Sequence, residues 1–285
     1  MGSLLTRREL LKWMGVGGAS LAAASLIIPK FASAADKVQP NAAATAQRLR
    51  RWTMIIDLRR CDGCIGLNMA PQCTQACILG HQLPEGMQFI QVFEYDLPRG
   101  GTYFLPAPCM QCQNAPCLNV CPVGATFATP EGVVLIDQQR CIGCRICMAA
   151  CPYSRRFFNW GTPKQPAAAA TQKYDLDMQT PAIKGTVMKC SFCQNLARTG
   201  LVPYCASGCP RKAIYYGDLE EDLATNTKEV IQVSTFLAHN QGFRLKEELN
   251  TQPRVYYIPG HGEAVGRSPY QNGLKQVTWP WGGKS

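Results

Sequence analysis

Several motifs that identify common redox and nucleotide-binding proteins are absent from this chain of 285 residues. It contains no Cys-x-x-Cys-His sequence, which argues against covalently attached c-type haem, and no P-loop. Its three histidines are too few for a histidine-rich metal centre. We find no nucleophile paired with a base, and no flavin- or nicotinamide-binding pattern. The chain therefore offers no substrate site of its own, as expected of a subunit that serves a catalytic partner.

A long hydrophobic run is also lacking. The longest apolar stretch, Val16 to Ile28, has about 13 residues, whereas a membrane-spanning helix needs roughly 20. It follows the twin-arginine sequence Thr6-Arg7-Arg8-Glu9-Leu10-Leu11-Lys12 and precedes Ala32-Ser33-Ala34, a small-residue cleavage sequence. We expect residues 1–34 to be a twin-arginine signal peptide, with retention as an anchor as the alternative. The predicted location is the periplasmic side of the cytoplasmic membrane.

What the chain has in abundance is cysteine, with sixteen in four runs of four. Each run opens with Cys-x2-Cys and closes with Cys-x3-Cys. The third run ends in a proline and has the bacterial ferredoxin spacing Cys-x2-Cys-x2-Cys-x3-Cys-Pro, whereas the others have longer middle gaps. Four ligands per run predict four 4Fe-4S clusters. The runs are Cys61, Cys64, Cys73 and Cys77 (run I); Cys109, Cys112, Cys117 and Cys121 (run II); Cys141, Cys144, Cys147 and Cys151 (run III); and Cys190, Cys193, Cys205 and Cys209 (run IV).

Zinc and disulfides are the two alternatives for so many cysteines. All-cysteine zinc sites usually consist of two Cys-x2-Cys pairs separated by a long spacer, which these runs do not resemble. Disulfides suit an exported protein with an even number of cysteines, but sulfurs so close along a tight loop make poor cross-links. A twin-arginine signal favours clusters, because cargo on this route is exported folded and can receive its clusters in the reducing cytoplasm.

The net charge of +10 suggests nucleic acid or an anionic membrane as a partner. Removal of residues 1–34 lowers it to about +7, and each oxidised cluster with four thiolates adds roughly −2, which leaves a nearly neutral protein. We therefore interpret much of the basic excess as compensation for the clusters. Basic residues that lie within two positions of a cysteine in the runs include Arg59, Arg60, Arg140, Arg145 and Lys189.

Each run follows a short apolar segment, which predicts a repeated unit of strand, ligand loop and short helix. The expected strands are 54–57, 102–105, 133–137 and 186–188. The closing cysteine of each run is expected to start the helix, with Pro122, Pro152 or Pro210 in its first turn, whereas run I has Ile78 instead. After run IV we expect a helix at 228–236 and a strand at 254–258.

The runs and the sequences around them resemble a known family. Phrases such as Ile56-Asp57-Leu58-Arg59-Arg60-Cys61, Lys189-Cys190-Ser191-Phe192-Cys193 and Arg254-Val255-Tyr256-Tyr257 are similar to the four-cluster iron-sulfur subunits of the molybdopterin oxidoreductase family, which includes the DMSO, polysulfide and tetrathionate reductases. The likeness covers roughly residues 52–258. It implies an α+β fold with two bacterial-ferredoxin-like dicluster halves, long loops and a C-terminal extension.

The residues and the resemblance together divide the chain. The twin-arginine pattern gives the signal peptide at 1–34, and the prolines and alanines between Gly161 and Gly185 indicate a surface connecting loop at 161–185. The resemblance implies a first half from 52–100 and 186–217 and a second half at 101–160, which leaves a linker at 35–51 and a C-terminal extension at 218–285.

Crossed ligation is a further implication of the resemblance, since each cluster would take three sulfurs from one run and the last from its partner run. We call each such group of four sulfurs a cage. A six-residue insertion before Cys73 departs from the family pattern, so the ligation of cage I is the least secure. The cages are Cys61, Cys64, Cys73 and Cys209 (cage I); Cys109, Cys112, Cys117 and Cys151 (cage II); Cys141, Cys144, Cys147 and Cys121 (cage III); and Cys190, Cys193, Cys205 and Cys77 (cage IV).

As partners the resemblance implies a molybdopterin catalytic subunit and an NrfD/PsrC-like integral membrane quinone subunit. The chain would relay electrons between them, in a respiratory oxidoreductase or in an assembly like alternative complex III. A free-standing periplasmic polyferredoxin is the alternative. An enzyme that uses one cluster as its catalytic centre is disfavoured, because an open iron site usually needs a missing ligand.

Three further features of the sequence are a histidine and two groups of aromatic residues. His81 is expected to make a local hydrogen bond rather than to ligate metal. The aromatic groups Phe157, Phe158 and Trp160, and Trp279 with Trp281, could contact the partners, although packing within the chain is the favoured interpretation.

Overall fold

The computed structural model of the chain describes residues 50–96, 102–260 and 275–276. The twin-arginine sequence, the cleavage sequence, most of the expected linker, and Trp279 with Trp281 lie outside these residues. None of the helices in the described part is long and apolar enough to cross a membrane.

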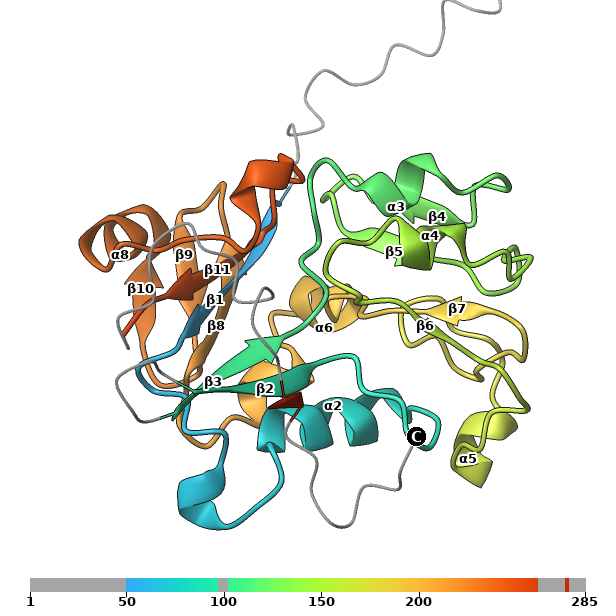
Figure 1. Ribbon diagram of the computed structural model, residues 1–285, viewed down its shortest axis with the longest axis horizontal. Helices are drawn as coiled ribbons and strands as arrows, with labels where there is room; N and C mark the ends of the chain where they lie inside the picture. The colour runs from blue at the N-terminus through green and yellow to red at the C-terminus, as the bar shows by residue number, and fades with distance from the viewer. Residues whose placement is uncertain (1–49, 97–101, 261–274, 277–285) are drawn as a thin grey trace, which may run out of the picture. The chain divides into compact units, whose positions relative to one another are not determined.

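Strands of one five-stranded sheet flank runs I and IV, with β1 before run I and β8 after run IV (Figure 1). Its central strand β1 pairs antiparallel with β8 and parallel with β11, which follows it by about two hundred residues. The strand order is β10-β9-β8-β1-β11, with β1 at Trp52–Asp57, β8 at Ile214–Asp218, β9 at Leu223–Thr225, β10 at Val230–Gln232 and β11 at Val255–Ile258.

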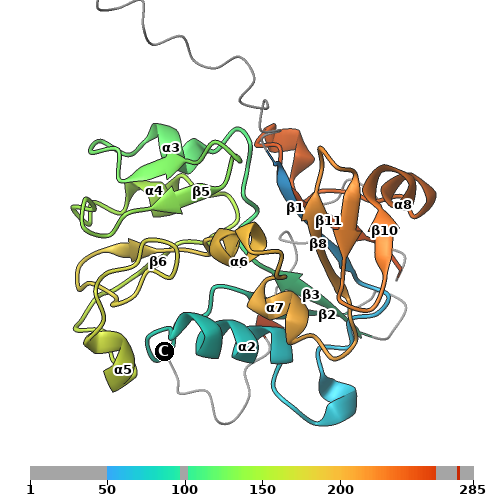
Figure 2. The ribbon, with the colours of Figure 1, turned by 180° about the vertical axis from the view of Figure 1, so that it is seen from behind.

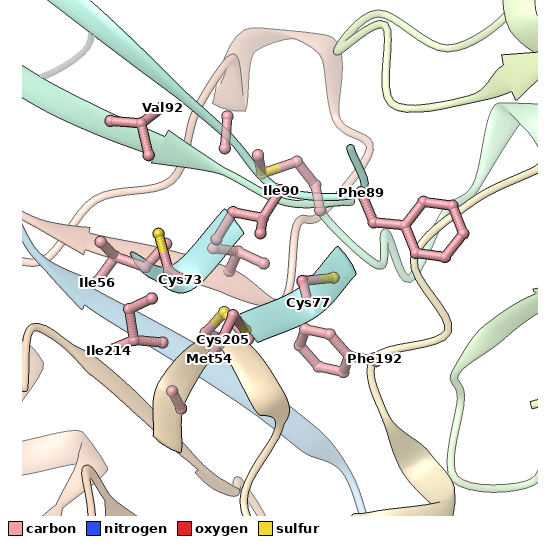
Figure 3. Packing of buried hydrophobic residues seen from close by; sticks show 14 of the residues in the cluster. Met54, Ile56, Cys73, Cys77, Phe89, Ile90, Val92, Phe192, Cys205 and Ile214 are labelled. Carbon is pink, nitrogen blue, oxygen red and sulfur yellow. The ribbon is translucent and has the colours of Figure 1, made fainter. Parts of the chain in front are cut away.

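The two faces of this sheet carry different layers, because side chains alternate along a strand. Ile55 and Tyr215 point to one face, where they pack with Val233 of helix α8 (Val233–His239). Met54, Ile56 and Ile214 point to the other face and join the main core. Helices α2 (Gln72–His81) and α7 (Tyr204–Ser207) pack against each other and contribute to this core. Figure 3 shows Cys73, Cys77 and Cys205 among its apolar side chains.

Runs II and III occupy a region of shorter elements. Helix α3 (Pro116–Asn119) packs against α4 (Ile146–Ala149), and β4 (Thr126–Ala128) pairs antiparallel with β5 (Val134–Ile136). Figures 1 and 2 both show this group apart from the five-stranded sheet. The fold as a whole is a mixed α/β arrangement, in agreement with the expected class.

The remaining elements connect these two regions. Strand β2 forms an antiparallel hairpin with β3, β12 adds to the β2 edge, and β6 pairs with β7. Short helical turns occur at η3, α5, α6 and η4. Their bounds are β2 Gln91–Asp96, β3 Thr102–Ala107, β12 Lys275–Gln276, β6 Phe157–Phe158, β7 Val187–Met188, η3 Ile65–Leu67, α5 Ala167–Ala170, α6 Gln194–Arg198 and η4 Glu247–Leu249.

Strands precede all four runs, as predicted, but they do not play equivalent parts. β1 pairs with β8, the strand that follows run IV, and β5 pairs with β4, the strand that follows run II. β3 pairs instead with β2, and β7 pairs with β6. The predicted strand at 254–258 is confirmed as β11. The predicted helix at 228–236 is wrong over its first part, where Val230 and Ile231 lie in strand β10 and pair with β9. β-branched residues such as these favour a strand over a helix, and the helix begins only at Val233.

The expectation that each closing cysteine starts a helix is also wrong. Helices α3, α4 and α7 precede Cys121, Cys151 and Cys209 and end before them. A residue before proline is disfavoured in the α conformation, so the Cys-Pro sequences end these helices. Run I has Ile78 after its closing cysteine, and here helix α2 continues to His81.

Candidate 4Fe-4S centres

The four Cys-x2-Cys loops share one backbone feature. The third residue of each loop has a positive φ: 61° at Gly63, 46° at Gln111, 71° at Gly143 and 60° at Phe192. Glycine suits this conformation, and a Cβ at Gly63 would also collide with the Phe104 ring. The loops of runs I and IV also share a positive φ at their second cysteine, 60° at Cys64 and 48° at Cys193, which those of runs II and III do not have.

Backbone and side-chain N–H groups point at several of the sulfurs. The backbone N–H of Gln72 donates to Cys64 Sγ at 3.4 Å, that of Phe192 to Cys190 Sγ at 3.3 Å and that of Ala213 to Cys209 Sγ at 3.4 Å. Hydrogen bonds of this kind favour the charged thiolate and tune iron-sulfur clusters. The donor set thus suits thiolates that bind a cluster.

Sulfurs from runs I and IV lie together. Burial raises the pKa of the Cys73 thiol well above its ordinary value, and the neighbouring sulfurs of Cys61, Cys209 and Cys64 raise it further. The structure therefore brings together three cysteines of run I and the last of run IV, the set expected for cage I, despite the insertion before Cys73.

The set expected for cage IV is grouped in the same way. Burial raises the pKa of Cys205 well above its ordinary value, and the neighbouring sulfurs of Cys193, Cys77, Cys190 and Cys73 raise it further. Cys77 in turn has Cys190, Cys193 and Cys73 as neighbours. The sulfur of Cys77 thus lies with run IV, and it also adjoins cage I through Cys73.

The four cysteines expected for cage II line one cavity. It contains about 340 Å³ of space free of protein atoms, part of it open to solvent, and its lining is almost wholly apolar. Cys109, Cys112 and Cys117 of run II line it together with Cys151, the last cysteine of run III. Arg156 also lines it. Four sulfurs around one apolar cavity fit a cluster with four thiolate ligands.

The set expected for cage III lies nearer the surface. Cys147 packs with Cys141 and also adjoins Cys117 of cage II. Cys144 is exposed. Burial raises the pKa of Cys121, but backbone N–H groups of Thr126, Val123 and Ala125 outweigh it and hold the pKa below its ordinary value. These donors would stabilise a Cys121 thiolate.

All sixteen cysteines are free thiols. Within the described part of the chain, no three His, Cys, Asp or Glu side chains are placed to hold a single metal ion. The thiolates of a cubane bind separate irons, so the relevant observation for a cluster is how the sulfurs group in fours.

The basic residues near the runs behave differently from one another. Arg59 pairs with Asp57 at 2.8 Å, and Arg60 pairs with Glu229 at 2.7 Å, so these two are neutralised by carboxylates. The Arg145 guanidinium lies 4.6 Å from the centre of the exposed Trp160 ring. Lys189 is fully buried, and its Nζ donates to the carbonyl oxygens of Val134 and Cys190.

Two residues near the sulfurs were not predicted to be there. His81 is buried, and its Nε2 lies 3.2 Å from Cys193 Sγ; burial lowers its pKa to about 4, so the ring is neutral at neutral pH. Arg156 is buried and donates through NH2 to Cys117 Sγ at 3.0 Å. The expectation of a hydrogen bond at His81 holds, although its partner is a cysteine distant in sequence. The sequence signal for the position of His81 is Ile78, which stands where the other runs have a proline. Helix α2 therefore continues past Cys77 and contains His81, four residues further on. We find no sequence signal for Arg156.

Of the predicted contact aromatics, Phe157 packs inward against Phe89, with ring centres 6.1 Å apart, and Phe158 is half-buried. Trp160 is exposed and contacts Phe158 and Arg145.

Comparison with known proteins identifies the family of the chain. Residues 101–172 match the family model described as a 4Fe-4S dicluster domain. The chain is 37% identical to a subunit of the selenate reductase of Mesobacillus selenatarsenatis, over 73% of this chain and 72% of that protein. It is 32% identical to a subunit of the tetrathionate reductase of Salmonella typhimurium, over 89% and 88% of the two chains. It is also 33% identical to the iron-sulfur cluster-binding subunit of menaquinone reductase from Nitratidesulfovibrio vulgaris, over 73% and 88%. The chain therefore belongs to the family of ferredoxin-like 4Fe-4S electron-transfer subunits of the molybdopterin oxidoreductases.

Proposed function

We propose that the chain binds four 4Fe-4S clusters in cages I to IV and relays electrons between a membrane quinone subunit and a molybdopterin catalytic subunit. The grouping of sulfurs from partner runs in cages I, II and IV is the observation that carries this proposal. Cysteines from two distant parts of the chain would bind each cluster. The two ferredoxin-like halves would be built on β1 with β8 and on β4 with β5. The clusters would supply the one-electron chemistry, and the protein would position and insulate them.

Contacts between the cages support a single line of clusters. Cys73 of cage I adjoins Cys77 of cage IV, Cys190 of cage IV adjoins Cys109 of cage II, and Cys117 of cage II adjoins Cys147 of cage III. The supported order is I, IV, II, III. An electron that enters at one end would pass through all four clusters before it leaves.

The test of ligation is to replace Cys151 with serine in the full chain, purified without oxygen. We expect wild-type protein to hold about sixteen irons and the variant to lose the cluster of Cys109, Cys112 and Cys117. Electron paramagnetic resonance, with Cys109→Ser as the matched variant, identifies the lost signal. Loss of the signal that Cys141→Ser removes would overturn crossed ligation, and a wild-type iron content near eight would overturn the count of four.

We further propose that the protein works on the periplasmic side of the membrane after twin-arginine export. The sequence around Arg7 and Arg8 supports this, and so does the need to load clusters before export. Replacement of both arginines with lysine is expected to leave cluster-loaded protein in the cytoplasm. Normal delivery to the periplasm would contradict this route.

Assembly with partners is tested by purification from detergent-solubilised membranes. We expect a complex that contains molybdenum or tungsten and an integral membrane subunit. Recovery of the chain as a soluble monomer would favour a free polyferredoxin. The similarity to a menaquinone reductase subunit favours a second candidate, an assembly like alternative complex III, which a complex without either metal would support.

A further inference from the structure

Two buried cations lie beside the cages without a carboxylate partner. Lys189 has 0% of its surface exposed and Arg156 has 4%. Among the residues that the structure describes, neither forms an ion pair with an acidic side chain within 4.0 Å. A buried charge is costly unless an opposite charge or strong hydrogen bonds compensate it. Hydrogen bonds and negative groups other than carboxylates must therefore compensate these two charges.

The sulfurs supply that charge at Arg156. Its NH2 donates to Cys117 Sγ at 3.0 Å and its NH1 to Thr126 Oγ1 at 3.0 Å. Burial lowers the pKa of Arg156, but the sulfurs of Cys117, Cys147 and Cys109 outweigh it and raise the pKa above its ordinary value. Two of these sulfurs belong to cage II and Cys147 belongs to cage III, so the guanidinium lies between the two cages.

Lys189 lies next to cage IV, close to where this cage approaches cage II, although its Nζ contacts backbone carbonyls rather than sulfurs. Its Nζ donates to the carbonyl oxygen of Cys190 at 2.7 Å, and it reaches across to the carbonyl oxygen of Val134 in β5. Cys190 Sγ also accepts a hydrogen bond from the backbone N–H of Cys109. The ammonium is thus beside the point where run IV meets run II.

Neutral amides keep this ammonium in place. Gln111 accepts from the Val134 N–H at 2.8 Å and donates to the Cys190 carbonyl at 2.9 Å. Gln179 accepts from the Lys189 N–H at 3.0 Å and donates to its carbonyl oxygen. Because these amides carry no net charge, they orient Lys189 without neutralising it.

Cage I has no such cation among the described residues. Its loop carries Asp62, whose carboxylate accepts from the Cys64 N–H at 3.0 Å and pairs with Arg211 at 2.7 Å near the surface. The opposite charges of Asp62 and Arg211 therefore offset each other beside cage I. Cages III and IV each adjoin one of these two cations, and cage II adjoins both.

We propose that Lys189 and Arg156 make the cluster of cage II the highest-potential cluster of the four, so that electrons collect in the middle of the line. Reduction adds one negative charge to a cluster, and a fixed cation in a dry environment stabilises the reduced form more than the oxidised form. This inference rests on the proposed four clusters. It goes beyond that proposal because it ranks their potentials and names the residues responsible.

The experiment is a redox titration of the full holo-protein, followed by electron paramagnetic resonance, on wild type, Arg156→Gln and Lys189→Met. Each substitution is expected to decrease the reduced-to-oxidised ratio of its adjacent clusters about tenfold at fixed potential, a fall of about 59 mV. The decisive result is that the cluster with the highest midpoint falls in both variants. A second cluster should fall with it, and it should be a different one in each variant.

Matched controls separate this effect from a general loss of charge. Arg140→Gln removes an exposed cation next to Cys141, and Lys184→Met removes an exposed lysine five residues before Lys189. Both are expected to leave the four midpoints nearly unchanged, because water screens exposed charges. Arg156→Lys and Lys189→Arg retain the charge and should restore most of the midpoint shift. They also provide a test if a neutral variant does not accumulate its clusters.

Three outcomes would overturn the inference. At full iron content, all midpoints could stay in place, or the cluster that falls in both variants could differ from the highest one. Arg140→Gln could also shift the midpoints as much as Arg156→Gln does. An iron content below that of four clusters in the wild type would instead refute the proposed function, so the two failures are distinguishable.

Discussion

The regions around runs I and IV and around runs II and III hold the same number of cysteines but bury them differently. Six of the eight cysteines in runs I and IV are buried, against one of eight in runs II and III. The cause is the fold, since the five-stranded sheet, α2 and α7 enclose the first set, whereas two-stranded sheets and short helices support the second. Similar ligand loops are thus placed in a dry and a more solvated environment, and solvent access is one of the factors that set cluster potentials.

The largest difference between the regions should appear when a crossed ligand is removed from each. Cys77→Ser leaves a hydroxyl and an incomplete cluster site in the dry core, so we expect it to lose at least half of the iron and much of the folded protein. Cys121→Ser changes a half-buried residue near the surface and should keep about three quarters of the iron. Iron content and thermal unfolding of the two variants measure the difference. Equal losses in both variants would show that burial does not distinguish the two regions.

Core truncation should sharpen the same comparison. Ile56 is fully buried in the central strand β1 between two neighbouring strands, whereas Ile136 lies in the two-stranded sheet and in a small cluster. We expect Ile56→Ala to lower the free energy of unfolding by about 3–5 kcal/mol and Ile136→Ala by about 2 kcal/mol, because the smaller cluster can relax around the cavity. Denaturant titration of the holo-proteins under anaerobic conditions measures both. A larger loss for Ile136→Ala would reverse our assignment of the stronger core.

Spacing was enough to predict the strands in front of the cysteine runs, because these strands depend on local sequence. The division of the sulfurs among the cages came from the family resemblance instead and stays a prediction. Non-local pairing was not predictable in the same way. Nothing near β11 indicates that it lies parallel to β1, and the 161–185 segment looked like a surface connection. Yet Gln179 within that segment is buried and binds both backbone groups of Lys189. Such contacts depend on the three-dimensional arrangement of distant segments.

The wrong prediction that each closing cysteine starts a helix has a local cause. Proline was interpreted as the first residue of a helix, whereas here Pro122, Pro152 and Pro210 follow helices that have already ended. Proline is compatible with both positions, so the residue type alone did not decide between them. The exception at Ile78 explains why His81 reaches cage IV.

A prediction of intermediate size compares the side-chain donors of the two regions. His81 contacts Cys193 as a neutral ring, whereas Arg156 contacts Cys117 as a cation. His81→Phe would remove the donor and keep an aromatic ring beside Phe89 and Tyr204. We expect the midpoint of one cluster to fall by less than in Arg156→Gln, because the neutral His81 ring carries no net positive charge to stabilise an added electron. Redox titration of both variants measures the order, and a larger effect at His81 would contradict it.

The smallest differences should be those at surface ion pairs, where the two regions are expected to behave alike. Hydrogen bonds from Tyr215 and Arg60 hold the pKa of Glu229 below its ordinary value of 4.5. Burial raises the pKa of Glu131, but its own backbone N–H, Thr129 and Arg198 outweigh burial and lower it. A carboxyl group with a lowered pKa in the folded state stabilises the protein above its unfolded pKa, and this stability is lost as the pH falls through the folded value.

We therefore expect Glu229→Gln and Glu131→Gln each to lower the free energy of unfolding at pH 7 by less than about 1 kcal/mol, since both pairs face solvent. The difference from wild type should shrink as the pH falls below 4.5 and disappear below the folded pKa, where the wild-type carboxyl is protonated as well. Denaturant midpoints measured from pH 7 to pH 3 test this. A loss in Glu229→Gln as large as that in Ile56→Ala would mean that the Glu229 contact with Tyr215 stabilises the five-stranded sheet, and it would extend the contrast between the two regions to their surfaces.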